Sequence, residues 1–131
     1  MNNEQFRKGK YIRLDSVEIA FNKTDAEINI NYHLSPFAQV YMFLFGSKNL
    51  EPKIREIFFD FENVQIQKVE RTSASVLIRN LSRQSGGYYL HESRELGMRP
   101  DTLIIVYPDG TRRNLQRTKF TQPAFYPVLY T

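Results

Sequence analysis

The residues best suited to catalysis form the run His91-Glu92-Ser93, which contains the side-chain types of a hydrolytic triad. In an extended strand His91 and Ser93 would share a face about 7 Å apart, and Glu92 would point to the opposite side. A general base must lie roughly 2.6–3.2 Å from the group that it deprotonates. The spacing therefore does not support a local triad, and no catalytic residue is predicted. An enzyme with a dispersed site near His91 is the weakest of three functional hypotheses.

Metal and cofactor chemistry finds little support in the sequence. The chain has two histidines and no cysteine, which excludes disulfides, thiolate zinc sites, iron–sulfur clusters and a cysteine nucleophile. His33 and His91 do not stand at the spacing of a metal site, so no metal ligand is predicted. The chain also lacks the glycine motifs that bind nucleotide phosphates, and no cofactor is expected.

Basic residues point to a second hypothesis, the binding of nucleic acid or another polyanion. The net charge is +4, and residues 67–131 hold ten Lys or Arg against five Asp or Glu. Residues 82–87 are expected to form a loop whose hydroxyls and two glycines could face an anion, with Arg79 and Arg99 near it in sequence. The anion-binding candidates are Arg83, Ser85, Arg94, Arg112, Arg113, Arg117 and Lys119. Solvated charge on a flexible connection or on an edge strand explains the same residues without a ligand, so both interpretations stay open.

Aromatic residues support the leading hypothesis, a non-catalytic interaction module that binds a protein partner or a copy of itself. The chain contains ten Phe and eight Tyr, more than a small core must hold. Tyrosine is enriched in interfaces and supplies much of their binding energy. The interface candidates are Tyr88, Tyr89, Phe125 and Tyr126.

The elements that would position these residues begin with a hairpin. Apolar and polar residues alternate from Val17 to Phe21 and, most clearly, from Ala26 to Leu34. A period of two indicates strands with one buried and one solvated face. The turn residues Asn22 to Asp25 predict that the two strands pair.

The apolar period then changes to that of a helix over residues 36–45. Ser35 can cap this helix, Pro36 suits its first position, and Gly46 stands where it would end. Its apolar residues recur at helical spacing: Phe37, Val40, Tyr41, Leu44 and Phe45. We expect it to be buried in the core, with a dimer interface as the alternative, because it is too short to span a bilayer. Its β-prone residues leave a buried strand open as the second interpretation.

A second helix is predicted over residues 50–59, with Asn49 as its cap. Glu51 and Pro52 suit its first turn. Its apolar stripe consists of Leu50, Ile54, Ile57, Phe58 and Phe61.

The rest of the chain is predicted to be extended. Strands are expected at residues 64–66, 74–78 and 102–107. Pro108-Asp109-Gly110 is the clearest turn, and residues 111–120 should return antiparallel after it. Because this last strand is polar on both faces, it should lie at an edge of the sheet.

These elements predict an α+β fold: an antiparallel sheet of about six or seven strands with one or two short helices, about 36–45 and 50–59, packed on one face. An all-β sandwich is the fallback if residues 36–45 form a strand. Residues 11–131 should form a single domain, preceded by a disordered segment over residues 1–10. No transmembrane segment and no signal peptide is seen, so a cytoplasmic location is expected.

Overall fold

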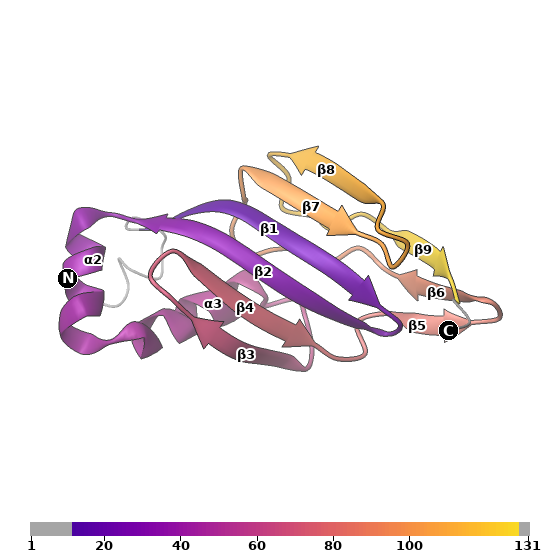
Figure 1. Ribbon diagram of the computed structural model, residues 1–131, viewed down its shortest axis with the longest axis horizontal. Helices are drawn as coiled ribbons and strands as arrows, with labels where there is room; N and C mark the ends of the chain where they lie inside the picture. Colours follow the sequence, from indigo (N-terminus) through magenta and orange to yellow (C-terminus); the bar gives the residue numbers. More distant parts are fainter. Residues whose placement is uncertain (1–11, 129–131) are drawn as a thin grey trace.

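A long antiparallel hairpin forms the centre of the protein (Figure 1). It joins β1 (Ile12–Asn22) to β2 (Asp25–Leu34), with Ile19 opposite Ile28. The alternation predicted from the sequence is confirmed, since every second residue of β2 is buried. The computed structural model describes residues 12–128, so the prediction of disorder for residues 1–10 lies outside the described residues.

Six strands form the main sheet, in the order β3-β4-β2-β1-β7-β8. The four strands that flank the hairpin are β3 (Val64–Val69), β4 (Ser73–Ile78), β7 (Thr102–Val106) and β8 (Arg112–Gln116). The α+β class is confirmed, and β8 lies at an edge as its polar sequence predicts. The sheet is mixed rather than wholly antiparallel, because β7 pairs with β1 in the parallel direction.

A second, three-stranded sheet consists of β5 (Arg83–Ser85), β6 (Tyr88–His91) and β9 (Ala124–Pro127), in that order. The expectation of a loop over residues 82–87 is wrong, because β5 and β6 form a hairpin whose turn contains Gly86 at φ +61°. All three residues of β5 are exposed, so this strand has no alternation of apolar residues that a sequence pattern could detect.

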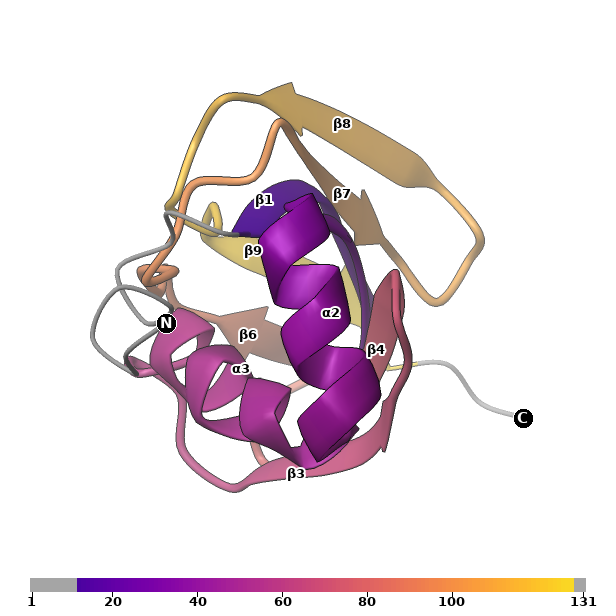
Figure 2. The ribbon, with the colours of Figure 1, turned by 90° about the vertical axis from the view of Figure 1, so that its left-hand side faces the viewer.

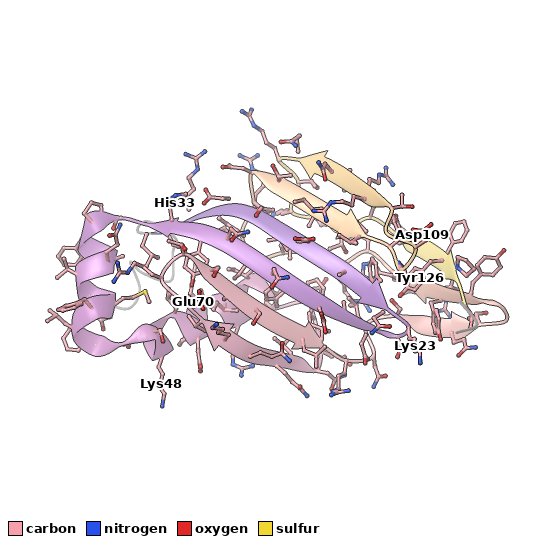
Figure 3. The ribbon with its side chains drawn as sticks, viewed as in Figure 1. Lys23, His33, Lys48, Glu70, Asp109 and Tyr126 are labelled. Carbon is pink, nitrogen blue, oxygen red and sulfur yellow. The ribbon has the colours of Figure 1, made fainter. Side chains whose placement is uncertain are left out.

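The core lies between the inner face of the main sheet and the elements that cover it. Its largest fully buried side chains include Tyr32, Leu14, Ile19 and Phe58. Tyr126 joins the two sheets, because its ring centroid lies 5.2 Å from that of Phe21 in β1. Its hydroxyl donates to the carbonyl of Lys23 at 2.6 Å, at the β1–β2 turn (Figure 3).

The helical segment crosses one end of the molecule (Figure 2). It consists of α2 (Pro36–Phe45), a 3₁₀ turn η1 (Ser47–Leu50) and α3 (Glu51–Ile57), so the all-β alternative does not apply. The Ser35 hydroxyl accepts a hydrogen bond from the amide of Ala38 at 3.2 Å, which confirms the predicted cap. Gly46 ends α2 at φ +86°, a left-handed backbone that favours glycine.

Asn49 caps the end of α2, not the start of the second helix as predicted. Its side-chain amide donates to the carbonyls of Phe45 at 2.9 Å and Gly46 at 3.2 Å, so it closes the end of α2 and does not start the next helix. The helical stripe from Leu50 to Phe61 is buried as predicted.

Candidate functional site

Helix α2 exposes the apolar side chains that its sequence predicts to be buried. Among its ten residues only Ala38 and Met42 are buried. Val40 is 58% exposed, Phe43 81% and Leu44 65%. The expectation of core burial is therefore wrong for most of this helix. The physical reason is its position: α2 follows the last residue of β2 and lies across the end of the sheet, so one side of it meets the body (Figures 1 and 2).

The exposed residues gather on the side of α2 that points away from the protein. Successive residues of a helix are rotated by about 100°. Phe43 and Leu44 therefore lie within about 60° of Val40 on either side, whereas Ala38 and Met42 lie roughly opposite to it. Phe45, in the last turn, is also 62% exposed, but it lies about 140° from Val40 around the helix, and its ring centroid is 4.8 Å from that of Tyr41. We call Val40, Phe43 and Leu44 the α2 face.

The α2 face is both large and uncharged. Phe43 alone leaves roughly 120–200 Å² of aromatic surface in water, and the exposed side chains of Val40 and Leu44 extend it. From Ser35 to Leu50 the single ionised side chain is that of Lys48, which extends away from the molecule just beyond the helix (Figure 3). Contiguous apolar patches of a few hundred Å² on a soluble protein mark interaction surfaces.

The interface candidates of the second sheet divide between its two sides. Tyr88 and Phe125 are exposed, at 49% and 70%, and their rings meet edge to face with centroids 5.9 Å apart. Tyr89 and Tyr126 are buried against the main sheet. The division follows from the strand period, because Tyr89 lies opposite Tyr126 across the β6–β9 pair. Tyr88 and Phe125 are therefore the pair that a partner could contact.

The anion-binding candidates are divided between sites: Arg83 and Arg94 line one hollow together with Glu92, and Arg117 and Lys119 line another. Four of them pair with carboxylates of this chain: Arg83 with Glu92 at 3.6 Å, Arg94 with Glu92 at 4.0 Å, Arg112 with Glu18 at 3.2 Å, and Lys119 with Glu95 at 3.0 Å. Ser85 lies in β5, on an exposed strand. Arg113 and Arg117 are exposed and have no carboxylate within 4.0 Å in the described part of the chain.

His91 is a buried structural residue with 2% of its surface exposed. Its Nε2 lies 2.9 Å from the Thr121 hydroxyl, which also donates to the Arg94 carbonyl at 3.3 Å. Within residues 12–128, Nδ1 has no hydrogen-bond partner.

The environment of His91 is unlike that of a general base poised for neutral pH. Burial, and secondarily the charge of Arg94, lowers the pKa of His91 to about 4. The Ser93 hydroxyl donates to the carbonyl of Thr121, and no hydrogen bond joins it to His91 among the described residues. His91 and Ser93 therefore tie β6 and the residues after it to the segment that contains Thr121.

Residues 12–128 contain neither a cluster of metal ligands nor a helix that could cross a bilayer. His33 pairs with Asp15, and no group of three or more possible metal ligands occurs within residues 12–128. In that same range no helix has the length and apolar character to cross a bilayer.

The α2 face left a weak signal in the sequence. Helix α2 carries no charged residue on any side. A helix that is apolar all round is usually buried. A chain of this size, however, has few elements that could cover every side of such a helix. This is the one feature of the sequence that indicates exposure of α2.

Comparison of this chain with protein-family models, with curated proteins and with solved structures found no match.

Proposed function

We propose that this chain is a non-catalytic interaction module that docks the α2 face into an apolar groove of a protein partner. The observation that carries the proposal is the exposure of Val40, Phe43 and Leu44 on a capped, ordered helix. Helix-in-groove recognition uses residues at this helical spacing as anchors. Burying one such side chain in a groove contributes roughly 1.5–3 kcal/mol before the costs of association.

The area of the α2 face favours a different protein over a second copy. Ten helical residues span about 15 Å. Two copies of α2 packed side by side would bury less than the roughly 1,000 Å² that a stable specific interface requires. A groove surrounds a helix on several sides and so buries more of each exposed ring. A partner with its own groove therefore satisfies the area requirement better.

Charge favours a protein groove over a lipid surface. Helices that lie in a membrane interface combine an apolar face with Lys and Arg residues that meet anionic headgroups. Helix α2 has no such residues, and Lys48 is the single Lys or Arg in the sequence from Ser35 to Leu50. We therefore expect a partner groove with apolar walls and a carboxylate on its rim near Lys48. A cytoplasmic location is part of this proposal.

The test compares the wild-type chain with the double variant Val40→Gln/Phe43→Gln. Phe59→Gln is the matched control, since Phe59 is 59% exposed but lies outside the α2 face. Each chain is immobilised to capture a partner from cells that express it, and the captured protein is purified and titrated by calorimetry. We expect one-to-one binding with a negative heat-capacity change. The double variant should weaken this binding by at least about tenfold, as loss of two anchors implies, and the control should not.

Three results would overturn the proposal. The first is equal partner binding by the double variant, and the second is the absence of any saturable partner. The third is a different occupant of the α2 face. Light scattering would reveal it as a dimer that Val40→Gln/Phe43→Gln dissociates, and sedimentation with anionic vesicles would reveal it as lipid binding that the same variant abolishes.

A further inference from the structure

We infer that a cleft between Arg99 and Arg117 binds single-stranded nucleic acid, through one phosphate group and the base beside it. The cleft is a shallow, open depression with a volume of about 530 Å³, and it is lined by residues that include Gly97, Arg99, Arg117, Thr118, Lys119 and Phe120. It is distinct from the α2 face, with which it shares no residue. We call it the Arg99–Arg117 cleft.

The main sheet brings the two arginines together although they stand far apart in sequence. Thr102 at the start of β7 pairs with Gln116 at the end of β8 (Figure 1). The residues that precede β7 and those that follow β8 therefore lie side by side at the same end of this strand pair. The amide of Arg117 donates to the carbonyl of Asp101 at 3.1 Å, which joins the two walls directly. The cleft therefore follows from the pairing of β7 and β8.

The walls of the cleft are fixed to each other and to the body. The amide of Leu96 donates to the Lys119 carbonyl at 2.6 Å, and the amide of Gly97 donates to the Ile57 carbonyl of α3 at 2.8 Å. Arg117 has φ +54°, a left-handed backbone that is uncommon for a residue with a side chain. Its hydrogen bond to Asp101 holds that conformation. Such an arrangement presents the arginines on a preorganised frame, which reduces the entropy lost on binding.

The balance of charge in the cleft is positive. Lys119 pairs with Glu95 at 3.0 Å, and the nearby carboxylate of Asp101 pairs with Arg13 at 2.9 Å. Neither Arg99 nor Arg117 has a carboxylate within 4.0 Å in the described range. This is the difference from Arg83, Arg94 and Arg112, whose charges are balanced within the chain. Two uncompensated guanidinium groups beside one cavity suit the oxygens of a phosphate, which arginine binds in a two-pronged geometry.

The exposed ring of Phe120 favours a nucleotide over other anions as the ligand. Its ring is 47% exposed at the cleft, and the Lys119 ammonium lies 5.8 Å from the ring centroid. An exposed aromatic ring beside cationic groups is the common device by which proteins hold single strands: a base stacks on the ring while the cations hold the phosphate. Duplexes offer no unstacked base to such a ring, so a single strand fits best.

The test measures binding of a fluorescent decauridylate by anisotropy at several salt concentrations. The variant Arg99→Ala/Arg117→Ala should weaken binding by at least about tenfold, since two charge-assisted phosphate contacts are lost. Arg83→Ala/Arg113→Ala removes the same charge from outside the cleft and should weaken binding less than about threefold, the effect of general electrostatics. Phe120→Leu should weaken binding by about fivefold or more, because base stacking is lost.

Competition against the fluorescent probe distinguishes a single strand from other ligands that carry phosphate. Unlabelled decauridylate should displace the probe at far lower concentrations than inorganic phosphate, uridine monophosphate or a duplex of the same length. Equal losses in the two double-arginine variants would overturn the cleft, because binding would then follow net charge alone. An unchanged affinity in Phe120→Leu, equal competition by inorganic phosphate or by the duplex, or no binding at low salt would also overturn the inference. Thermal unfolding of each variant checks that it is folded, and the α2 variants should bind the probe normally.

Discussion

The Thr121 hydroxyl lies 2.9 Å from the Nε2 of His91 and 2.8 Å from the backbone nitrogen of Arg94. One buried hydroxyl therefore serves a side chain of β6 and the chain that follows it. Replacing Thr121 with Val keeps the shape and removes this oxygen, which leaves the His91 Nε2 and the Arg94 N–H without their partner. We expect the free energy of unfolding to fall by about 2–4 kcal/mol, the cost of leaving two polar groups unsatisfied. Urea unfolding measures it, with Thr121→Ser as the conservative control; equal stability of all three proteins would refute the assignment.

The low pKa of His91 predicts that the stability of the protein depends on acid. The pKa of His91 is about 4 in the folded protein, against 6.5 for an ordinary histidine. Between these values the unfolded chain binds more protons, so stability is greatest above about pH 6.5 and is lost as the pH falls toward 4. The full contribution is roughly 3 kcal/mol.

His91→Leu should lose the part of this acid sensitivity that the imidazole causes. The measurement is the free energy of unfolding by urea at about pH 7 and about pH 4.5. Exposed carboxylates titrate equally in both proteins, so the smaller decrease in His91→Leu isolates the imidazole. An identical decrease in the two proteins would contradict the prediction.

Gly97 is a position at which no side chain fits. A Cβ at Gly97 would lie 2.1 Å from the carbonyl oxygen of Glu56 in α3. Gly97→Ala should therefore destabilise the protein by about 2 kcal/mol or more, because backbone must move. Gly87→Ala is the matched control, since its Cβ would meet nothing within 4 Å. Similar thermal midpoints for the two variants would show that the loop before Arg99 is not packed against α3 as described.

Substitutions on the two sides of α2 should differ in their effect on stability. Val40→Gln/Phe43→Gln changes exposed side chains and should alter the free energy of unfolding by no more than about 1 kcal/mol. Met42→Ala removes a buried side chain and should cost about 2–3 kcal/mol. Chemical denaturation of the purified variants checks both values. A large loss in the double variant would mean that the α2 face is covered within the chain itself.

Much of the fold could be predicted from local patterns. The alternation in β2, the Ser35 cap and the Gly46 stop each depend on residues near in sequence, and all three appear in the structure. The strand β5 could not be predicted, since its three exposed residues carry no pattern. The parallel pairing of β1 with β7 joins segments about eighty residues apart, and no local signal encodes it.

The candidate sites were harder to predict because they depend on exposure and on tertiary pairing. The apolar period of α2 indicates a helix but not which side meets the core. The sequence identifies Arg117 and Lys119 as candidate anion-binding residues. The cleft also needs Arg99, which lies on the opposite wall, and Phe120, which follows Lys119 in the sequence. A sequence shows how many arginines a chain has. Which of them are neutralised depends on carboxylates brought near by folding, as Glu18 is to Arg112.

The position of β1 also has a consequence for how the chain is made. β1 is synthesised before β7, which covers one of its edges and follows about eighty residues later. At 5–20 residues per second this interval is roughly 4–16 s. Throughout it the hairpin presents an open row of N–H and C=O groups beside Val17 and Ile19, which invites pairing with another nascent chain. Fragments that stop before Thr102 should therefore aggregate, and synthesis slowed in that interval should lower the yield of native protein.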